Sequence, residues 1–516
     1  MTSPSSAPRA GRREWIGLAV IALPCAVYAM DLTVLNLAVP ALSEELKPSS
    51  SQLLWIIDVY GFLVAGFLIT MGTLGDRIGR RRLLLIGGAA FGAASTVAAF
   101  SNSAEMLIAM RALLGIAGAT LAPSTMSLIR NMFHDGHERQ FAIGVWIASF
   151  SVGGAIGPLV GGVLLEFFWW GSVFLVAVPV MALLLVLGPA LLPEYKDPQA
   201  GRLDMASVAL SLGAVLPVIY ALKQIAESGL AALPVAILAG GLGVGAVFVR
   251  RQSRLAYPLL ELKLFRQKRF SAAIAAYGLS CLAMFGVYIF ITQYLQLVLG
   301  LSPLHAGLAT VPWSLAFVAG SLLAPRLSRR VAPLTIIVGG LLTSAVGFLL
   351  LLLAHTGIAL PALVVGTVVM ALGMAPVITV GNEMIITAAP PERAGAASAL
   401  SETAAEFNAA LGIAVLGSIG TAVYRAALSE AMPGGVPPEA MATLGGAESA
   451  ARALGGPAGE ALLAAARASF VDAMQLNAVI AAATVVVAAV VSARILRGSG
   501  DAPRGARAVS GATGGD

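Results

Sequence analysis

The sequence predicts an all-α polytopic membrane protein, and its composition and the arrangement of its apolar residues indicate this class. Of 516 residues, 58% are hydrophobic and 11% are charged, far below the ~25% charged residues of typical soluble domains. The apolar residues form runs of about 20, the length that a helix needs to cross a bilayer. Membrane β-barrels show alternating segments of ~10 residues instead, so the runs favour a helical bundle.

We predict fourteen transmembrane helices with both termini in the cytoplasm. The predicted spans are residues 14–40, 53–73, 83–101, 105–129, 140–164, 171–192, 204–223, 230–250, 270–296, 304–325, 333–355, 358–382, 395–424 and 471–494. This arrangement leaves most of the 32 lysines and arginines in cytoplasmic segments, as the positive-inside rule requires. Arg111 falls inside a span, and the outer side holds only Lys47, Lys223, Arg425, Arg452 and Arg467.

A basic cluster in the longest inner loop divides the chain after the eighth span. Its members are Arg250, Arg251, Arg254, Lys263, Arg266, Lys268 and Arg269. We predict two six-helix bundles with pseudo-two-fold symmetry plus a two-helix insertion. The units are a cytoplasmic segment 1–13, a bundle 14–192, a linker and extra helix pair 193–250, a basic loop 251–269, a bundle 270–497 with an outer loop 425–470, and a cytoplasmic tail 498–516, expected to be disordered. A repeat supports the division, because PRLSRR after the tenth span resembles DRIGRR after the second.

The loop between the second and third spans reads GTLGDRIGRRR, from Gly72 to Arg82. It places Asp76 beside Arg77, Arg80 and Arg81. An acid among guanidiniums forms charge-assisted pairs, which one arrangement of the bundles makes and another breaks. The alternative is that these arginines only fix the topology.

The fifth span contains GVWIASFSVGGAIGPLVGG, which is rich in glycine. Small residues such as Gly153, Gly157 and Gly161 let helices approach closely. Pro158 removes a backbone donor and permits bending. These residues are therefore candidates for conformational gating, with ordinary close packing as the alternative.

These two stretches resemble a known family. The loop GTLGDRIGRRR looks like the signature loop of the major facilitator superfamily, and the fifth-span motif is similar to that of its drug/proton antiporters. Asp31 with Thr33, Asn36 and Pro40 resembles the first-span signature of the fourteen-span branch. The resemblance implies an exporter that rocks two six-helix bundles and exchanges protons for lipophilic cations.

Three charged residues lie in the outer halves of predicted spans. Asp31 is in the first span, Asp58 in the second, and Arg111 in a fourth-span stretch, LIAMRALLGIAG, that resembles a family motif. A charge at this depth costs ~2.5–3.5 kcal/mol unless it is paired. We expect the three to form a buried proton-coupling cluster, with Asp31 also contacting the substrate. A structural ion pair for Arg111 and a helix-dipole role for Asp58 remain alternatives.

The thirteenth span carries two further acids. Glu402 and Glu406 are four residues apart and share one helix face, where two carboxylates do not both ionise cheaply. This region resembles that of quaternary-ammonium exporters, which implies that both acids bind organic cations and couple protons, with Asn408 nearby. The tenth span contains no acid, which argues against efficient handling of divalent cations.

Several aromatic residues are candidates for cation-π contacts in a substrate cavity. They are Tyr28, Trp146, Phe150, Tyr288, Tyr294 and Trp313. Simple packing is the alternative for each. Trp15, Trp55, Trp169 and Trp170 are expected in the interfacial belt.

The sequence shows no Cys/His cluster and no nucleotide-binding fingerprint, so we expect no metal, no cofactor and no enzymatic activity. Basic residues are scattered among short loops, which gives no nucleic-acid site. The prediction is a monomeric proton-coupled multidrug efflux antiporter of the bacterial inner membrane, exporting lipophilic and mostly cationic drugs. Export of an endogenous metabolite or antibiotic is the alternative, followed by proton-coupled solute uptake.

Overall fold

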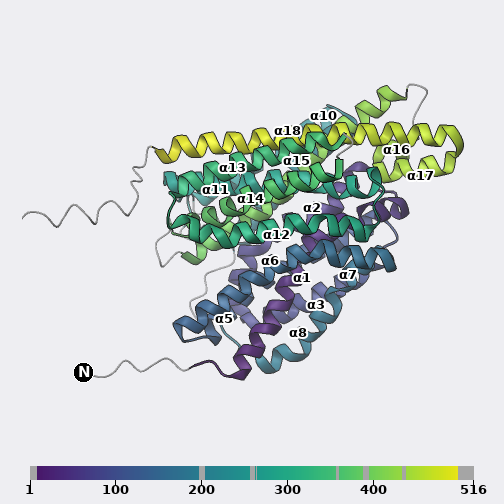
Figure 1. Cartoon of the computed structure of the whole chain (residues 1–516). Coiled ribbons are helices and arrows are strands. Elements are labelled where there is room, and N and C mark those ends of the chain that lie inside the picture. Colours follow the sequence, from purple (N-terminus) through teal and green to yellow (C-terminus); the bar gives the residue numbers. More distant parts are fainter. Residues whose placement is uncertain are drawn as a thin grey trace, which may run out of the picture.

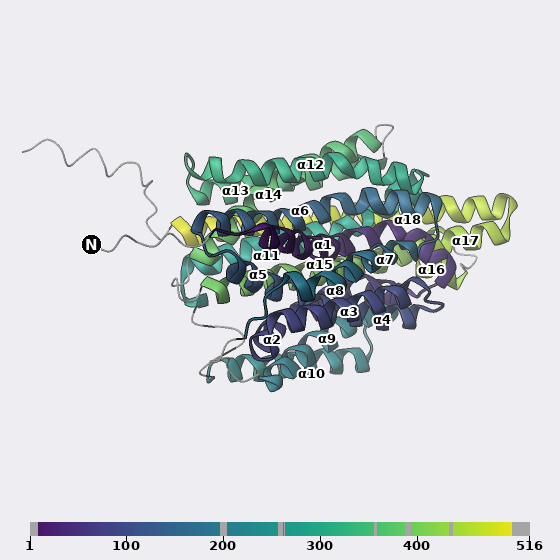
Figure 2. The same ribbon diagram turned by 90° about the horizontal axis from the view of Figure 1, so that it is seen from below.

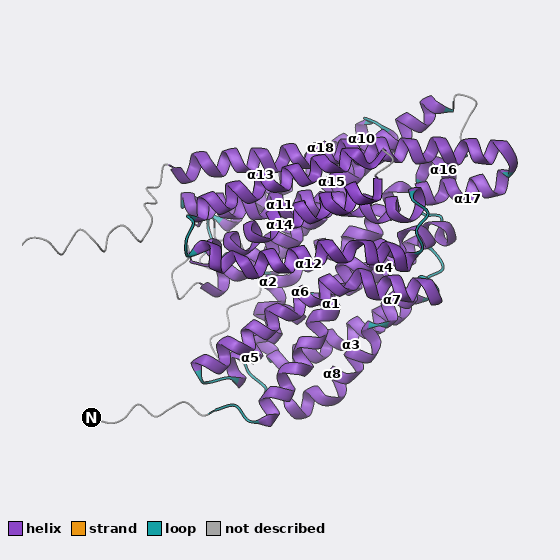
Figure 3. Ribbon diagram, in the orientation of Figure 1, coloured by secondary structure: helices purple, strands orange, loops and turns teal. Residues whose placement is uncertain are grey.

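A computed structural model describes residues 9–196, 204–255, 258, 262, 264–355, 359–387, 394–432 and 437–497. In these ranges every regular element is a helix (Figure 3). Fourteen helical segments are long and apolar enough to cross a membrane, which agrees with the predicted count. The tail 498–516, residues 1–8 of the N-terminal segment, and parts of the linker and the basic loop lie outside the described residues.

The first bundle contains six spans made from eight helices. They are α1 (Arg12–Leu46), α2 (Ser50–Ile78), α3 (Arg80–Ala99), α4 (Ala104–Gly118), α5 (Leu121–Met132), α6 (Gly136–Phe167), α7 (Ser172–Leu175) and α8 (Ala177–Leu191). The fourth span, Ala104–Met132, consists of two consecutive helices, α4 and α5, with a short break between them. An extra hairpin follows, made of α9 (Met205–Ser228) and α10 (Ala232–Gln252).

The second bundle begins after a short 3-10 turn, η1 (Leu264–Arg266). Its helices are α11 (Lys268–Gln293), η2 (Tyr294–Val298), α12 (Pro303–Ser328), α13 (Pro333–Leu350), η3 (Leu351–His355), α14 (Ala359–Thr387), α15 (Ala394–Ala431), α16 (Pro438–Ala442), α17 (Leu444–Leu454) and α18 (Gly456–Arg497). Most of the outer loop predicted at 425–470 is therefore helical. The extended C-terminal end of α15, the helices α16 and α17, and the start of α18 occupy it.

Local sequence explains where α2 begins and ends. The Ser49 side chain accepts a hydrogen bond from the Gln52 backbone N–H, and the Gln52 side chain accepts one from the Ser49 N–H, which is a capping box. Gly79 ends the helix with φ 113°, a conformation that favours glycine. The signature loop is thus a one-residue break between α2 and α3, and Asp76 lies on the last turn of α2.

The two bundles lie one above the other in Figure 1, with the first in purple to blue and the second in green to yellow. We call the end where α1 begins the N-terminal side and the end with α16 and α17 the far side. Figure 2 shows the same long axis, with α17 projecting at the far side. Helices α2 and α15, and helices α6 and α12, pack against each other across the seam between the bundles.

Hydrogen bonds between the bundles gather on the far side. Gln296 donates to the Leu37 carbonyl over 3.0 Å, and Ser50 donates to the Ala442 carbonyl. Arg452 of α17 pairs with Glu44 at the end of α1. Two further hydrogen bonds between the bundles lie nearer mid-depth, from Ser314 to the Ala155 carbonyl and from Tyr28 to Glu406.

Candidate functional site

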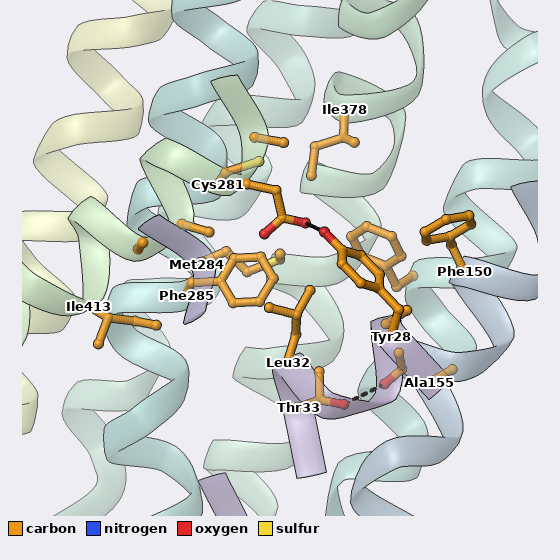
Figure 4. A pocket seen from close by; sticks show the side chains of 18 of the residues that line it. Tyr28, Leu32, Thr33, Phe150, Ala155, Cys281, Met284, Phe285, Ile378 and Ile413 are labelled. Atoms are coloured by element: carbon orange, nitrogen blue, oxygen red, sulfur yellow. Dashed lines mark hydrogen bonds between the residues drawn. The ribbon is translucent and has the colours of Figure 1, made fainter. Parts of the chain in front are cut away.

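A cavity of about 320 Å³ lies between the bundles at mid-depth, a volume that suits a drug-sized molecule. Seven helices, α1, α2, α6, α11, α12, α14 and α15, contribute to its wall. Figure 4 shows the apolar character of that wall, with Leu32, Phe150, Phe285 and Ile413 around an open space. Among the described residues of the wall, two carry carboxyl groups, Asp58 and Glu406.

Glu406 lies where the two bundles meet. The Tyr28 hydroxyl on α1 donates a 2.9 Å hydrogen bond to its Oε1 on α15 (Figure 4). In the described part of the chain, no lysine or arginine forms an ion pair with Glu406. Glu402 is one turn earlier on the same helix and is not among the lining residues. Glu406 is thus the acid that a ligand in the cavity meets without an internal cation.

Arg111 is fully buried and pairs with Asp31 of α1. Its Nε also donates to the Ile56 carbonyl over 3.0 Å, and its guanidinium lies 4.6 Å from the centre of the Tyr60 ring. The predicted pairing of these two residues agrees with this geometry. The third residue of the predicted cluster, Asp58, lies within the electrostatic reach of Arg111 but forms its ion pair with another residue.

That partner is Lys223, from the extra hairpin. Lys223 Nζ donates to Asp58 Oδ1 over 2.9 Å, and both side chains are fully buried. Asp58 is more than two turns inside α2, so a helix-dipole role at an N-terminus does not apply. The placement of Lys223 on the outer side was wrong, because α9 continues to Ser228 and carries the lysine within the bundle.

The sequence held one signal for this pair. The predicted seventh span ended at Lys223 only because its charge closed the apolar run, while Ile225 follows two residues later. The ring of Trp55, expected in the interfacial belt, lies 3.9 Å from the Lys223 ammonium. When a lysine ends an apolar run and another span contains an acid without an obvious partner, the two residues are therefore candidates for a buried ion pair.

The aromatic candidates divide into two groups. Tyr28, Phe150 and Trp313 line the cavity. Trp146 packs edge-on against Phe150, with ring centres 4.7 Å apart, and Tyr288 lies against Trp313 at 5.2 Å. These two form a second layer that positions the lining rings.

Two other candidates make hydrogen bonds away from the cavity wall. The Tyr294 hydroxyl donates to the Ala354 carbonyl, and the Asn408 amide donates to the Ala404 carbonyl on its own helix. Neither residue is among those lining the cavity. Other lining side chains were not singled out from the sequence. They include Tyr277, Met284, Phe285, Phe317, Val318 and Ile378.

The side chains of the charged signature loop make their ion pair and hydrogen bonds with other residues of the first bundle. Arg80 pairs with Asp76 over 2.5 Å and donates to the Pro123 carbonyl on α5. Arg81 donates to carbonyls at the end of α8, and Arg77 is exposed. In this structure the loop therefore joins α2, α5 and α8 of one bundle.

The glycine motif packs α6 against two neighbours. Gly153, Gly157 and Gly161 all face α1, and a Cβ at Gly153 would lie 2.0 Å from the Ala26 carbonyl oxygen. On another face α6 contacts α12, where a Cβ added at Gly307 would lie 2.6 Å from the Pro158 carbonyl oxygen. Small residues thus permit close packing inside the bundle and across the seam.

Sequence comparisons agree with this architecture. A family model described as Major Facilitator Superfamily matches residues 21–413. The chain is 47% identical over 490 residues to the multidrug efflux pump LfrA of Mycolicibacterium smegmatis, covering 94% of this chain and 97% of that protein. It is 36% identical over 471 residues to the methyl viologen resistance protein SmvA of Salmonella typhimurium, covering 89% and 93%.

A solved structure shares the fold. It is a bacterial homologue of the human lysosomal transporter Spinster, in an inward-facing and unoccupied conformation. The TM-score is 0.63 at 17% identity, over 94% of this chain and 98% of that one. The chain therefore belongs to the major facilitator superfamily. The number of helices, the paired bundles and the signature loop agree with this assignment.

Proposed function

We propose that this protein is a proton-coupled efflux antiporter that exports lipophilic cationic compounds across a bacterial inner membrane. One observation carries the proposal: a drug-sized apolar cavity between two bundles holds Glu406 with no internal cation. The names of the efflux and resistance proteins that it resembles support drugs as the substrate class.

The cavity wall matches the chemistry of a lipophilic cation. Apolar surface favours the body of such a molecule, and the rings of Tyr28, Phe150 and Trp313 offer faces for cation-π contact. Glu406 supplies a negative charge in a place with little water. A charge in such a site favours a ligand of opposite charge over a neutral one of the same shape.

The same carboxylate supports coupling to protons. A proton on Glu406 and a cation beside it neutralise the same charge, so the two ligands compete, and each favours a different state of the transporter. Glu402, on the same face of α15, is a second proton site in this proposal, and Asp31 beside Arg111 is a third. Each proton that moves inward releases roughly 2.3 kcal/mol per 100 mV.

The arrangement of the bundles supports alternating access. If the N-terminal side is cytoplasmic, the structure corresponds to an inward-facing state, because the bundles are bonded together on the far side. Rocking of one bundle against the other would break these contacts and open the far side. The close glycine packing of α6 on α1 and α12 provides a surface for this motion. A monomer contains every part that the cycle requires.

The proposed role of the signature loop is to hold the first bundle as a rigid unit during this motion. Asp76, Arg80 and Arg81 make the contacts, and exposed Arg77 is left to reach the second bundle in the other state. We expect Asp76→Asn to slow transport several-fold without lowering the amount of protein in the membrane. Unchanged transport would leave the loop as a topology anchor only.

Transport of ethidium into and out of proteoliposomes under an imposed pH gradient tests the proposal. We expect gradient-dependent movement for the wild-type protein and none for Glu406→Gln. Asp31→Asn and Glu402→Gln are expected to weaken the dependence on the gradient. Movement that is independent of the gradient would exclude proton coupling, and absence of any movement would exclude export of this class of cation.

A further inference from the structure

The two acids of the cavity wall differ in their partners. Asp58 and Glu406 both line the cavity, yet only Asp58 forms an ion pair, with Lys223. Arg111 is already engaged with Asp31. The net charge that the wall offers to a ligand is therefore set by one lysine that stands outside the wall.

The position of Lys223 is fixed by packing. Helix α9 lies in the seam and contacts α2 of the first bundle and α15 of the second. Its Ile219 forms an apolar cluster with Phe62 of α2 and Ala414 of α15. The lysine ammonium is held between Asp58 and the ring of Trp55. The hairpin is thus more than a linker, because it delivers a cation to the edge of the cavity.

Asp58 also retains capacity for a ligand. Its Oδ1 accepts from Lys223, while its Oδ2 is buried and has no hydrogen-bond partner. A buried carboxylate oxygen without a partner is costly, and here the residue borders an open cavity. That oxygen is closed off from the cavity in this structure, so a donor or a cationic group of a ligand would satisfy it only by displacing a neighbouring side chain of the wall.

We propose that Lys223 is a positioning residue that determines substrate charge. By neutralising Asp58 it leaves Glu406 as the only uncompensated acid of the wall, so that the cavity prefers a molecule with one positive charge over one with two. This inference rests on the proposed export of cations.

The charge of Lys223 can be removed without removing its stem. In Lys223→Met the side chain keeps an apolar body against Trp55 and loses the ammonium. Asp58 then remains in the cavity wall as a second carboxylate that has lost its ion-pair partner. A dication gains a partner for its second charge, while a monocation gains little.

Ethidium and propidium are suitable probes, because they share one ring system and differ by one quaternary ammonium group. Their dissociation constants are measured by fluorescence on purified protein in nanodiscs. We expect wild-type protein to bind ethidium in preference to propidium, and Lys223→Met to shift the ratio toward propidium about tenfold, the change that 1.4 kcal/mol produces. The matched control Lys223→Arg keeps the charge and is expected to keep the wild-type ratio.

A double variant separates charge from folding. In Asp58→Asn/Lys223→Met both charges are absent, so the ratio is expected to return to that of the wild type. An unchanged ratio in Lys223→Met, with ethidium still bound, overturns this inference and leaves the proposed function standing. A Lys223→Met protein that does not fold, with a folded double variant of shifted ratio, overturns it as well. If the wild type binds neither dye, the proposed function fails first.

Discussion

Two buried ion pairs join described residues of this membrane protein, and they differ in what they connect. Asp31 and Arg111 join α1 to α4 inside the first bundle, and Arg111 is also bound by backbone carbonyls. Asp58 and Lys223 join the first bundle to the extra hairpin at the edge of the cavity. The same chemistry therefore holds a rigid unit together in one place and borders a ligand space in the other.

The identity of the cation sharpens this difference. An arginine stays charged when its partner is removed, whereas a buried lysine can lose its proton and become neutral. In the pair inside the bundle the arginine thus stays charged, and only the carboxylate of Asp31 can take up a proton. In the pair at the cavity, the lysine can also become neutral when its partner is protonated or removed. Such a pair is suited to a site that binds ligands and protons.

Arg111→Met is expected to have the largest effect on stability. It leaves Asp31 buried without a partner and removes the donor to the Ile56 carbonyl, so we expect a loss of about 3–5 kcal/mol. Chemical unfolding of the purified protein in detergent measures it. Asp31→Asn/Arg111→Met serves as the control, because removal of both charges is expected to recover most of the loss. A loss below about 1 kcal/mol would remove the distinction between buried and exposed pairs.

Asp58→Asn is expected to cost less, about 1–3 kcal/mol, because Lys223 can respond by losing its proton. A double-mutant cycle with Lys223→Met gives the coupling between the two residues, which we expect within the ~0.5–3 kcal/mol range of contacting residues. The same unfolding experiment applies. Coupling indistinguishable from zero would mean that the ion pair contributes nothing to the packing of the hairpin.

Glu406→Gln is expected to change stability by only about 1 kcal/mol, the net value of a hydrogen bond. No buried cation loses its partner, and the new amide oxygen still accepts from the Tyr28 hydroxyl. Ethidium transport is nevertheless expected to be abolished. A destabilisation as large as that of Arg111→Met would indicate that Glu406 has a structural partner and would weaken its proposed role.

Arg452→Ala is expected to have the smallest effect. Its pairs with Glu44 and Glu448 are exposed, and such contacts contribute about 0.2–1 kcal/mol. The hydrogen bond to Glu448 raises the pKa of Arg452 above its usual value, so its charge is permanent and salt alone weakens the contact. Melting temperatures at low and high ionic strength measure the effect. A salt-independent difference would contradict an electrostatic origin.

The comparison of the two pairs also shows what a sequence can predict. The fourteen helices follow from apolar runs and loop charge. The sequence also places Arg111 at the depth of two acids, Asp31 and Asp58, and the structure shows that Asp31 is the one that pairs with it. The partner of Asp58 could not be obtained in this way, because it is 165 residues distant and depends on how the hairpin docks in the seam. Helix rotation, which a depth estimate does not contain, likewise decided that Phe150 lines the cavity and Tyr294 does not.

Helix α18 has 42 residues, roughly 60 Å at 1.5 Å per residue, about twice the ~30 Å hydrocarbon core of a bilayer. In Figure 1 its first turns project at the far side together with α17, so the helix is longer than a bilayer-spanning segment needs to be. A rigid rod that pivots near its middle moves farthest at its tip. Spin labels at Glu44 and Arg452, one at the end of each bundle, would therefore report a large change in distance when the bundles move during transport.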